Sequence, residues 1–196
     1  MTQLPENPRL FVAVEMPGEV REALGRLQHE LQRRGLESLR WVRPEGIHLT
    51  LKFLGETSGE RLPAIREALA GATDGIAAHS LSLGSLGTFG SRRSPRVLWM
   101  DLTGDVETLL RLQAGVDRAL VATGFPSESR PFSAHVTLAR VRPENAVRVA
   151  GPLAEALGSV AAPKAEIPVN EVSLMMSKIG PGGAVYTRLD SFPLSG

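Results

Sequence analysis

Two short stretches of the chain repeat the pattern His-x-Thr-Leu, with His48 in the first and His135 in the second. The chain holds four histidines, and chance would place two of them in this setting in roughly a few of ten thousand such sequences. The repetition predicts an internal duplication, with one polar pair in each half. Two imidazoles and two hydroxyls that face one cleft would suit acid–base chemistry on a phosphate group.

Alternation along a strand places the reactive groups of each motif on one face, because side chains at i, i+2 and i+4 point the same way. In the first motif the alternation predicts that His48, Thr50 and Lys52 face the cleft, whereas Phe53 and the leucines face a core. The second motif is expected to behave in the same way. Each strand would then offer one imidazole and one hydroxyl, backed by apolar side chains.

Histidine suits both proton transfers that cleavage of a phosphodiester requires. One group must take a proton from the nucleophile and another must protonate the leaving oxygen, and imidazole titrates near pH ~6.5. Each partner is typically worth ~10²–10⁴ in rate. Threonine hydroxyls and arginine can hold the non-bridging oxygens. The scheme needs no metal ion, and no third ligand stands at a metal-binding spacing from the two histidines.

The other two histidines and Lys52 are expected to be structural or solvated. His79 shares strand parity with Leu81, which favours the edge of the core. His29 falls on the polar side of an amphipathic helix. Lys52 is expected at a solvated rim, because lysine is rarely buried.

Composition indicates a globular protein, with 42% hydrophobic and 22% charged residues in 196. That length fits one domain of two lobes. The chain has no cysteine, which excludes disulfides and thiolate metal sites. The apolar run near the N-terminus is too short for a signal segment or a membrane span. We therefore expect a cytoplasmic protein that does not contact membranes.

Arginine supplies nearly all of the positive charge, with 19 of the 22 cationic residues. A net charge of only +1 argues against a general nucleic-acid coat. Segment 91–96, however, holds Arg92, Arg93 and Arg96 without an acidic residue. Guanidinium groups bind phosphate oxygens bidentately, so these three arginines are candidate contacts to the phosphates of a nucleic acid or nucleotide.

Turn signals and hydrophobic periodicity predict strands mixed with amphipathic helices around the motifs. Strands are predicted over 9–15, 47–54, 76–86, 96–102 and 134–141, with a hairpin of 171–178 and 184–189 and a loop over 87–95. Helices are predicted from Val20 to a stop at Gly35, from 57–58 to a stop at Gly71, over 105–121, and near 145–157 with Pro152 in a first turn or at a break. The mixture lacks a regular βαβ alternation, so it favours an α+β fold with antiparallel sheets. The second half is expected to repeat the order of the first.

The motifs and their surroundings resemble the 2H phosphoesterase superfamily and, within it, the bacterial and archaeal RNA 2′,3′-cyclic phosphodiesterases, also called 2′-5′ RNA ligases. The likeness runs in the family's order through Arg9–Val14, Trp41–Gly55, Pro95–Trp99, Pro131–Arg140 and Gly180–Tyr186. It implies a LigT-like α+β fold, with two pseudo-symmetric lobes of antiparallel sheet, flanking helices and a central cleft, in a single domain over residues 1–196.

The resemblance implies opening of an RNA 2′,3′-cyclic phosphate to a 2′-phosphate, without a metal or other cofactor. If a 5′-hydroxyl replaces water, the same site would form a 2′-5′ bond. The resemblance also implies that His48 is the proton donor to the departing 3′-oxygen and that His135 is the proton acceptor that orients water. Reversing the reaction exchanges these roles. Thr50 and Thr137 match the phosphate-binding threonines of the family.

Arg140 matches a phosphate-binding arginine five residues after the second histidine. Because five is odd, an ideal strand would place Arg140 on the face opposite His135, so a bulge or the strand's end must re-aim it. Phe11 and Tyr186 are candidate contacts to a base or ribose. Trp99 stands in an apolar strand and is expected in the core.

Other functions remain open. A related enzyme would act on a cyclic nucleotide or a 2′-5′ oligonucleotide, and a non-catalytic RNA-binding module would keep the fold. Binding alone would not need two matched imidazoles. The chain has no Walker loop for a nucleoside triphosphate, and Gly180–Gly183 is expected to form only a tight turn. We expect a monomer that acts on RNA ends, with nucleotides as further ligands.

Overall fold

Strands and helices follow one another without a regular alternation in the computed structural model, which describes residues 5–180 and 183–196. The strands are β1 (Arg9–Glu15), β2 (Arg40–Trp41), β3 (His48–Glu56), β4 (His79–Ser91), β5 (Ser94–Gly104), β6 (His135–Arg140), β7 (Glu166–Val169), β8 (Glu171–Gly180) and β9 (Gly183–Pro193). The α-helices are α1 (Gly18–Leu31), α2 (Leu62–Thr73), α3 (Val106–Ala122) and α4 (Ala146–Ser159). Within these described ranges, no helix is long and apolar enough to cross a membrane.

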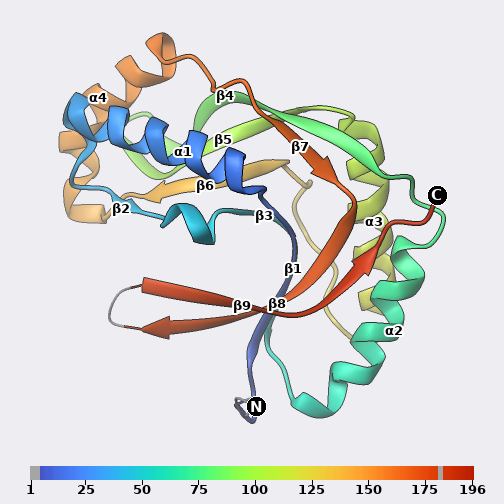
Figure 1. The fold of residues 1–196 in the computed structure, drawn as a ribbon. Coiled ribbons are helices and arrows are strands. Elements are labelled where there is room, and N and C mark those ends of the chain that lie inside the picture. Colours follow the sequence, from blue (N-terminus) through green and yellow to red (C-terminus); the bar gives the residue numbers. More distant parts are fainter. Residues whose placement is uncertain (1–4, 181–182) are drawn as a thin grey trace.

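The strands form one antiparallel sheet that divides into two lobes (Figure 1). The strand order is β7-β4-β5-β6-β3-β1-β8-β9, and β2 pairs with β6. The lobes meet where β3 and β6 pair through Leu49 and Val136. This architecture confirms the predicted α+β fold with two lobes of antiparallel sheet.

Each lobe takes strands from both halves of the sequence. In one lobe, β1 and β3 lie beside β8 and β9, which end the chain. In the other, β4 and β5 lie beside β6 and β7. The two lobes therefore do not correspond to the two halves of the sequence, although each half supplies one motif strand, because the chain crosses between the lobes before each half is complete.

Two pairs of helices cover the sheet. Figure 1 shows α1 beside α4 on one side of the molecule and α2 beside α3 on the other. The side-chain amide of Gln28 in α1 donates to the backbone carbonyls of Val42, at 2.8 Å, and Leu138, at 3.1 Å. The second of these hydrogen bonds connects α1 to β6. Apolar residues of all four helices join the strands in one continuous core.

The predicted helices are confirmed in position but differ at their ends. α1 is followed by Gly35 at φ +88°, a left-handed conformation that glycine adopts readily. α2 runs through Gly71 to Thr73, beyond its predicted stop. Pro152 lies inside α4 rather than in a first turn. Its ring stands beside Gly35, a tertiary contact that local propensity does not reveal.

The predicted loop over 87–95 is mostly strand. β4 continues to Ser91 and β5 begins at Ser94, so that Arg92 and Arg93 form the tip of a hairpin. Glycine usually marks a loop, but Gly87 lies in β4 directly under the indole of Trp99, where a Cβ atom would overlap the ring. The glycine that favoured a loop in the sequence is a packing requirement in the fold.

Candidate active site

The two motif histidines begin the central strands, β3 and β6. The residues that follow them, Leu49 and Val136, pair with each other and are completely buried in the core. Extending this antiparallel register by one residue in each direction places His48 opposite Thr137. It likewise places Thr50 opposite His135. The fold therefore brings the two polar pairs together crosswise on the face opposite the core, which we call the histidine face.

Each motif strand carries a bulge at its leucine. The register between β1 and β3 skips Leu51, and the register between β5 and β6 skips Leu138. A bulge adds one residue to one strand and so inverts the alternation beyond it. The residue five positions after each histidine therefore returns to the histidine face.

The bulge at Leu138 accounts for the odd offset of Arg140. Ala139 is buried in the core, whereas Arg140 is exposed. The positive charge of Arg140 also lowers the pKa of Tyr186, although burial, the larger effect, raises it overall. Arg140 thus lies on the histidine face, as the sequence-based expectation of a bulge required.

The matching bulge in β3 overturns the predictions for Lys52 and Phe53. The Lys52 side chain is only 1% exposed, where it pairs with the Asp117 carboxylate of α3 and donates to the backbone carbonyl of Pro126 at 2.7 Å. Phe53, which was expected in a core, is 60% exposed and lies 6.2 Å from Phe11 between ring centroids. Simple alternation was wrong here because it does not continue past the bulge.

His48 packs against two aromatic rings that also contact each other. The ring centroid of Phe11 is 4.7 Å from that of His48, and the centroid of Tyr186 is 4.9 Å away. Nδ1 stands 2.8 Å from the carbonyl oxygen of Gly46. Because a carbonyl can only accept, Nδ1 donates and Nε2 is left for proton exchange. Burial lowers the pKa of His48, and the Gly46 bond and the charge of Glu15 oppose that shift.

His135 has a parallel environment in the other lobe. Its ring centroid lies 5.0 Å from that of Phe89 and 6.0 Å from that of Trp99. Nδ1 stands 2.7 Å from the carbonyl oxygen of Ser133, so Nε2 is again the nitrogen left for proton exchange. The prediction of Trp99 in the core is wrong. Trp99 pairs with Thr137 across β5 and β6 and shares its face, where it is partly exposed.

On the neighbouring strand, a carboxylate lies directly opposite each histidine. Glu15 is opposite His48, and Asp101 is opposite His135. Glu15 also accepts a hydrogen bond from Ser173 at 3.0 Å. Sequence reasoning missed both acids, because the pairing partners of each motif strand lie more than 30 residues away in the chain.

Both predicted aromatic contacts lie beside His48. Tyr186 packs over the backbone of Gly46, where an added Cβ would come within 3.2 Å of its ring. Phe11 contacts Tyr186 edge-on, with 5.3 Å between centroids. Burial raises the pKa of Tyr186, and the charge of Arg9, a residue that the sequence reasoning missed, opposes that shift. The position of Arg9 two residues before Phe11 was the available signal, since the two share a strand face.

The three arginines predicted as RNA contacts do not join the histidines. Arg92 and Arg93 are exposed at the tip of the β4–β5 hairpin. Arg96 has the strand parity of Leu98, which is buried in the core, so its side chain leaves from the other face. The remaining histidines also lie elsewhere. His29 is exposed on α1, and His79 is half-buried at the start of β4.

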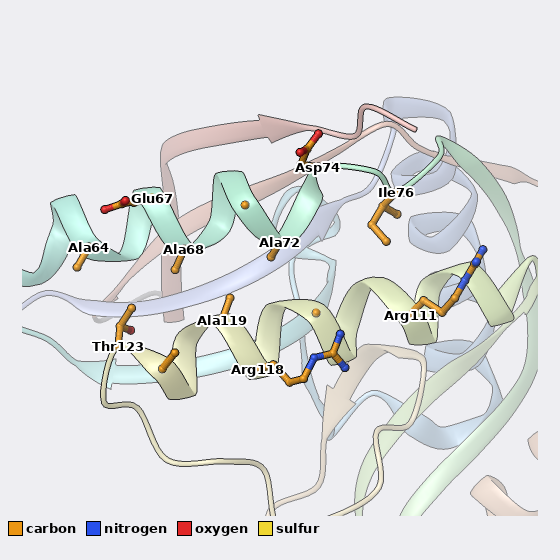
Figure 2. A pocket seen from close by; sticks show the side chains of 13 residues that line it. Ala64, Glu67, Ala68, Ala72, Asp74, Ile76, Arg111, Arg118, Ala119 and Thr123 are labelled. Atoms are coloured by element: carbon orange, nitrogen blue, oxygen red, sulfur yellow. The ribbon is translucent and has the colours of Figure 1, made fainter.

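A pocket of about 670 Å³ lies away from the motifs, between α2 and α3 (Figure 2). Alanine and glycine make up most of its lining, and Arg111 and Arg118 extend from α3 at its side. Neither motif histidine belongs to this lining. The groove exists because the side chains between the two packed helices are small. We assign no chemistry to it.

Known proteins resemble this chain in both sequence and fold. The sequence profile of the LigT like phosphoesterase family matches residues 14–99 and 102–186, and each segment contains one motif. An RNA 2′,3′-cyclic phosphodiesterase of Thermus thermophilus is 38% identical, over 96% of this chain and 91% of its own. Another, of Geobacillus stearothermophilus, is 35% identical over 66% of this chain, which spans only 41% of that longer relative.

Among solved structures, E. coli LigT complexed with 3′-AMP has a TM-score of 0.76 at 29% identity, over 97% of this chain and 100% of its own. All of these findings indicate the same family: the motif strands are duplicated, the fold is shared, and both matched segments contain a motif. The chain belongs to the LigT like phosphoesterase family.

Proposed function

We propose that this protein is a metal-independent RNA 2′,3′-cyclic phosphodiesterase that opens the cyclic phosphate at an RNA end to a 2′-phosphate. One observation carries the proposal. Two imidazoles, each with Nδ1 bonded to a backbone carbonyl, share one face with two threonines. The names of the Thermus and Geobacillus relatives support this substrate, and the complex of E. coli LigT with 3′-AMP supports a nucleotide as ligand.

In the proposed reaction, Nε2 of His135 takes a proton from water as the water oxygen bonds to phosphorus. The bond between phosphorus and the 3′-oxygen breaks, and Nε2–H of His48 protonates that oxygen. Thr50, Thr137 and Arg140 hold the non-bridging oxygens and offset the charge that develops on them. If an RNA 5′-hydroxyl attacks instead of water, the product is a 2′-5′ phosphodiester.

The electrostatics of His48 constrain its role as donor. Burial lowers the pKa of His48 and so favours its neutral ring. A donor must be protonated. A bound phosphate anion would raise the pKa of His48, as the charge of Glu15 already does in part. We therefore infer that the substrate itself completes the protonation of the donor.

Aromatic rings lie beside each histidine and supply stacking surfaces for the nucleoside that carries the cyclic phosphate and, in ligation, for the nucleoside whose 5′-hydroxyl attacks. Phe11 and Tyr186 serve the first lobe, and Phe89 and Trp99 serve the second. The arginines of the β4–β5 hairpin, Arg92, Arg93 and Arg96, would meet only an RNA long enough to reach them. We further propose that residues 1–196 act as one bilobal domain and as a cytoplasmic monomer.

The test is turnover of an RNA oligomer with a 2′,3′-cyclic phosphate end and of cyclic mononucleotides, in EDTA, with the position of the product phosphate read out. We expect a 2′-phosphate product, and a loss of about 10²–10⁴ in rate in His48→Ala and in His135→Ala. His29→Ala, an exposed change on α1, serves as the matched control. Normal turnover in either motif variant, or inactivity without added metal, contradicts the proposal.

A further inference from the structure

Two arginines stand directly across from each other on β2 and β6. Arg40 pairs with Arg140, and Trp41 pairs with Ala139. Residues opposite one another in a ladder share a face of the sheet. Ala139 is buried in the core and Trp41 packs against it, so that pair faces inward. Arg40 and Arg140 therefore both lie on the histidine face.

This cross-strand pair lacks an acidic partner. Like charges placed directly opposite each other destabilise a sheet. Across the described ranges, the salt bridges of the protein engage other cations, and no carboxylate pairs with Arg40 or Arg140. Both side chains are exposed. An anion bound between the two guanidinium groups would relieve their repulsion through charge-assisted hydrogen bonds.

The pair lies toward the end of β6 that is far from its histidine. β3 pairs with β6 at Val136, and β2 takes the same edge of β6 at Ala139 and Arg140. Five residues with one bulge separate Arg140 from His135, roughly 13 Å along the strand. Arg140 can reach back toward a phosphate at the histidines. Arg40, one strand further out, is placed for a different phosphate.

We propose that Arg40, beside Arg140, forms a second phosphate subsite that binds the phosphodiester next to the cyclic end of an RNA strand, while Arg140 reaches the cyclic phosphate itself. The inference rests on the proposed function and narrows its substrate class. A mononucleotide carries no such second phosphate, so the subsite favours an oligonucleotide over a cyclic mononucleotide. The preference is electrostatic and falls as salt rises.

The test compares kcat/KM for a trinucleotide ending in a 2′,3′-cyclic phosphate with kcat/KM for the matching cyclic mononucleotide. We expect Arg40→Gln to lower the ratio of the two values about 10-fold, the loss of one charge-assisted contact. Arg40→Lys keeps the charge without the fork and should retain part of the preference. For the trinucleotide, the slope of log(kcat/KM) against log[salt] should become shallower by about 0.7 in Arg40→Gln.

Arg118→Gln is the matched control, since Arg118 is an exposed arginine of α3 beside the α2–α3 pocket. Its ratio should equal that of the wild type. An unchanged ratio in Arg40→Gln, or an equal loss on both substrates, overturns the subsite. If the wild type turns over neither substrate, the proposed function fails. The subsite is then judged separately, by whether Arg40→Gln weakens binding of a trinucleotide with a 2′-phosphate end.

Discussion

Phe53 and Arg140 occupy the same position of the two motifs, although one is apolar and the other is charged. Each lies five residues after its histidine and reaches the histidine face through a bulge at the motif leucine. Phe53 is opposite Phe11 in β1, and Arg140 is opposite Val97 in β5. The two positions therefore match in backbone but not in side chain: one lobe places an aromatic ring there, and the other places an arginine that we propose binds phosphate.

This division predicts unequal effects of matched substitutions. Arg140→Gln should lower kcat/KM about 100-fold, or ~2.7 kcal/mol, because it removes charge stabilisation at the phosphate. Phe53→Ala removes an exposed ring and should lower kcat/KM by no more than about fivefold, mainly through KM. Steady-state kinetics on one RNA substrate measure both. Equal losses would show that the two positions are equivalent in function as well as in backbone.

Glu15→Gln should shift the pH dependence of the reaction. The Glu15 carboxylate raises the pKa of His48 against the larger, lowering effect of burial. Removing that charge lowers the pKa of His48 further. If His48 donates a proton, activity is lost as pH rises through its pKa, and the alkaline limb of kcat/KM moves to lower pH.

The pH profile also tests the assignment of roles. Movement of the acidic limb instead of the alkaline limb would make His48 the base of the free enzyme. Glu19→Gln, an exposed change in the first turn of α1, should leave both limbs in place. Circular dichroism should confirm the fold of both variants, because Glu15 also bonds Ser173 and pairs with Arg188.

Lys52→Met should destabilise the protein. It leaves the Asp117 carboxylate, which is only 19% exposed, without its ammonium partner. Breaking a fully buried pair costs about 3–5 kcal/mol, and we expect about 2–3 kcal/mol here because Asp117 retains some contact with water. Urea unfolding measures the loss. The double variant Lys52→Met/Asp117→Leu removes both charges and should recover most of the stability, whereas an additive loss would contradict the ion-pair explanation.

Gly87→Ala should disturb the second histidine indirectly. A Cβ at this position overlaps the Trp99 indole, which packs against Phe89 and His135. Overpacking of this kind costs about 1–3 kcal/mol. We expect a changed tryptophan emission spectrum and a loss of about 10-fold in kcat at a temperature where the variant stays folded. Gly18→Ala is the control, because its Cβ would meet no atom within 4 Å. A normal kcat in Gly87→Ala would show that the position of the Trp99 ring does not affect catalysis.

The repeated motif, the strands that carry it and the helices that cover them could all be predicted from the sequence. Local patterns suffice for these features, because alternation in a strand and the apolar stripe of a helix depend on neighbouring residues. His48, Thr50, His135 and Thr137 could be placed on common faces for the same reason. The odd offset of Arg140 from the second histidine likewise indicated a bulge or a strand end, since unbroken alternation would separate the two side chains.

The points where alternation stops, and the strands that pair, depend instead on tertiary contacts. The bulge at Leu51 turns Lys52 into the core and Phe53 out of it, because a bulge is fixed by pairing with β1 rather than by β3 alone. The exchange of strands between lobes, and the pairing of Arg40 with Arg140, join segments far apart in the chain. Such contacts depend on how a whole sheet closes, which no local pattern of residues specifies.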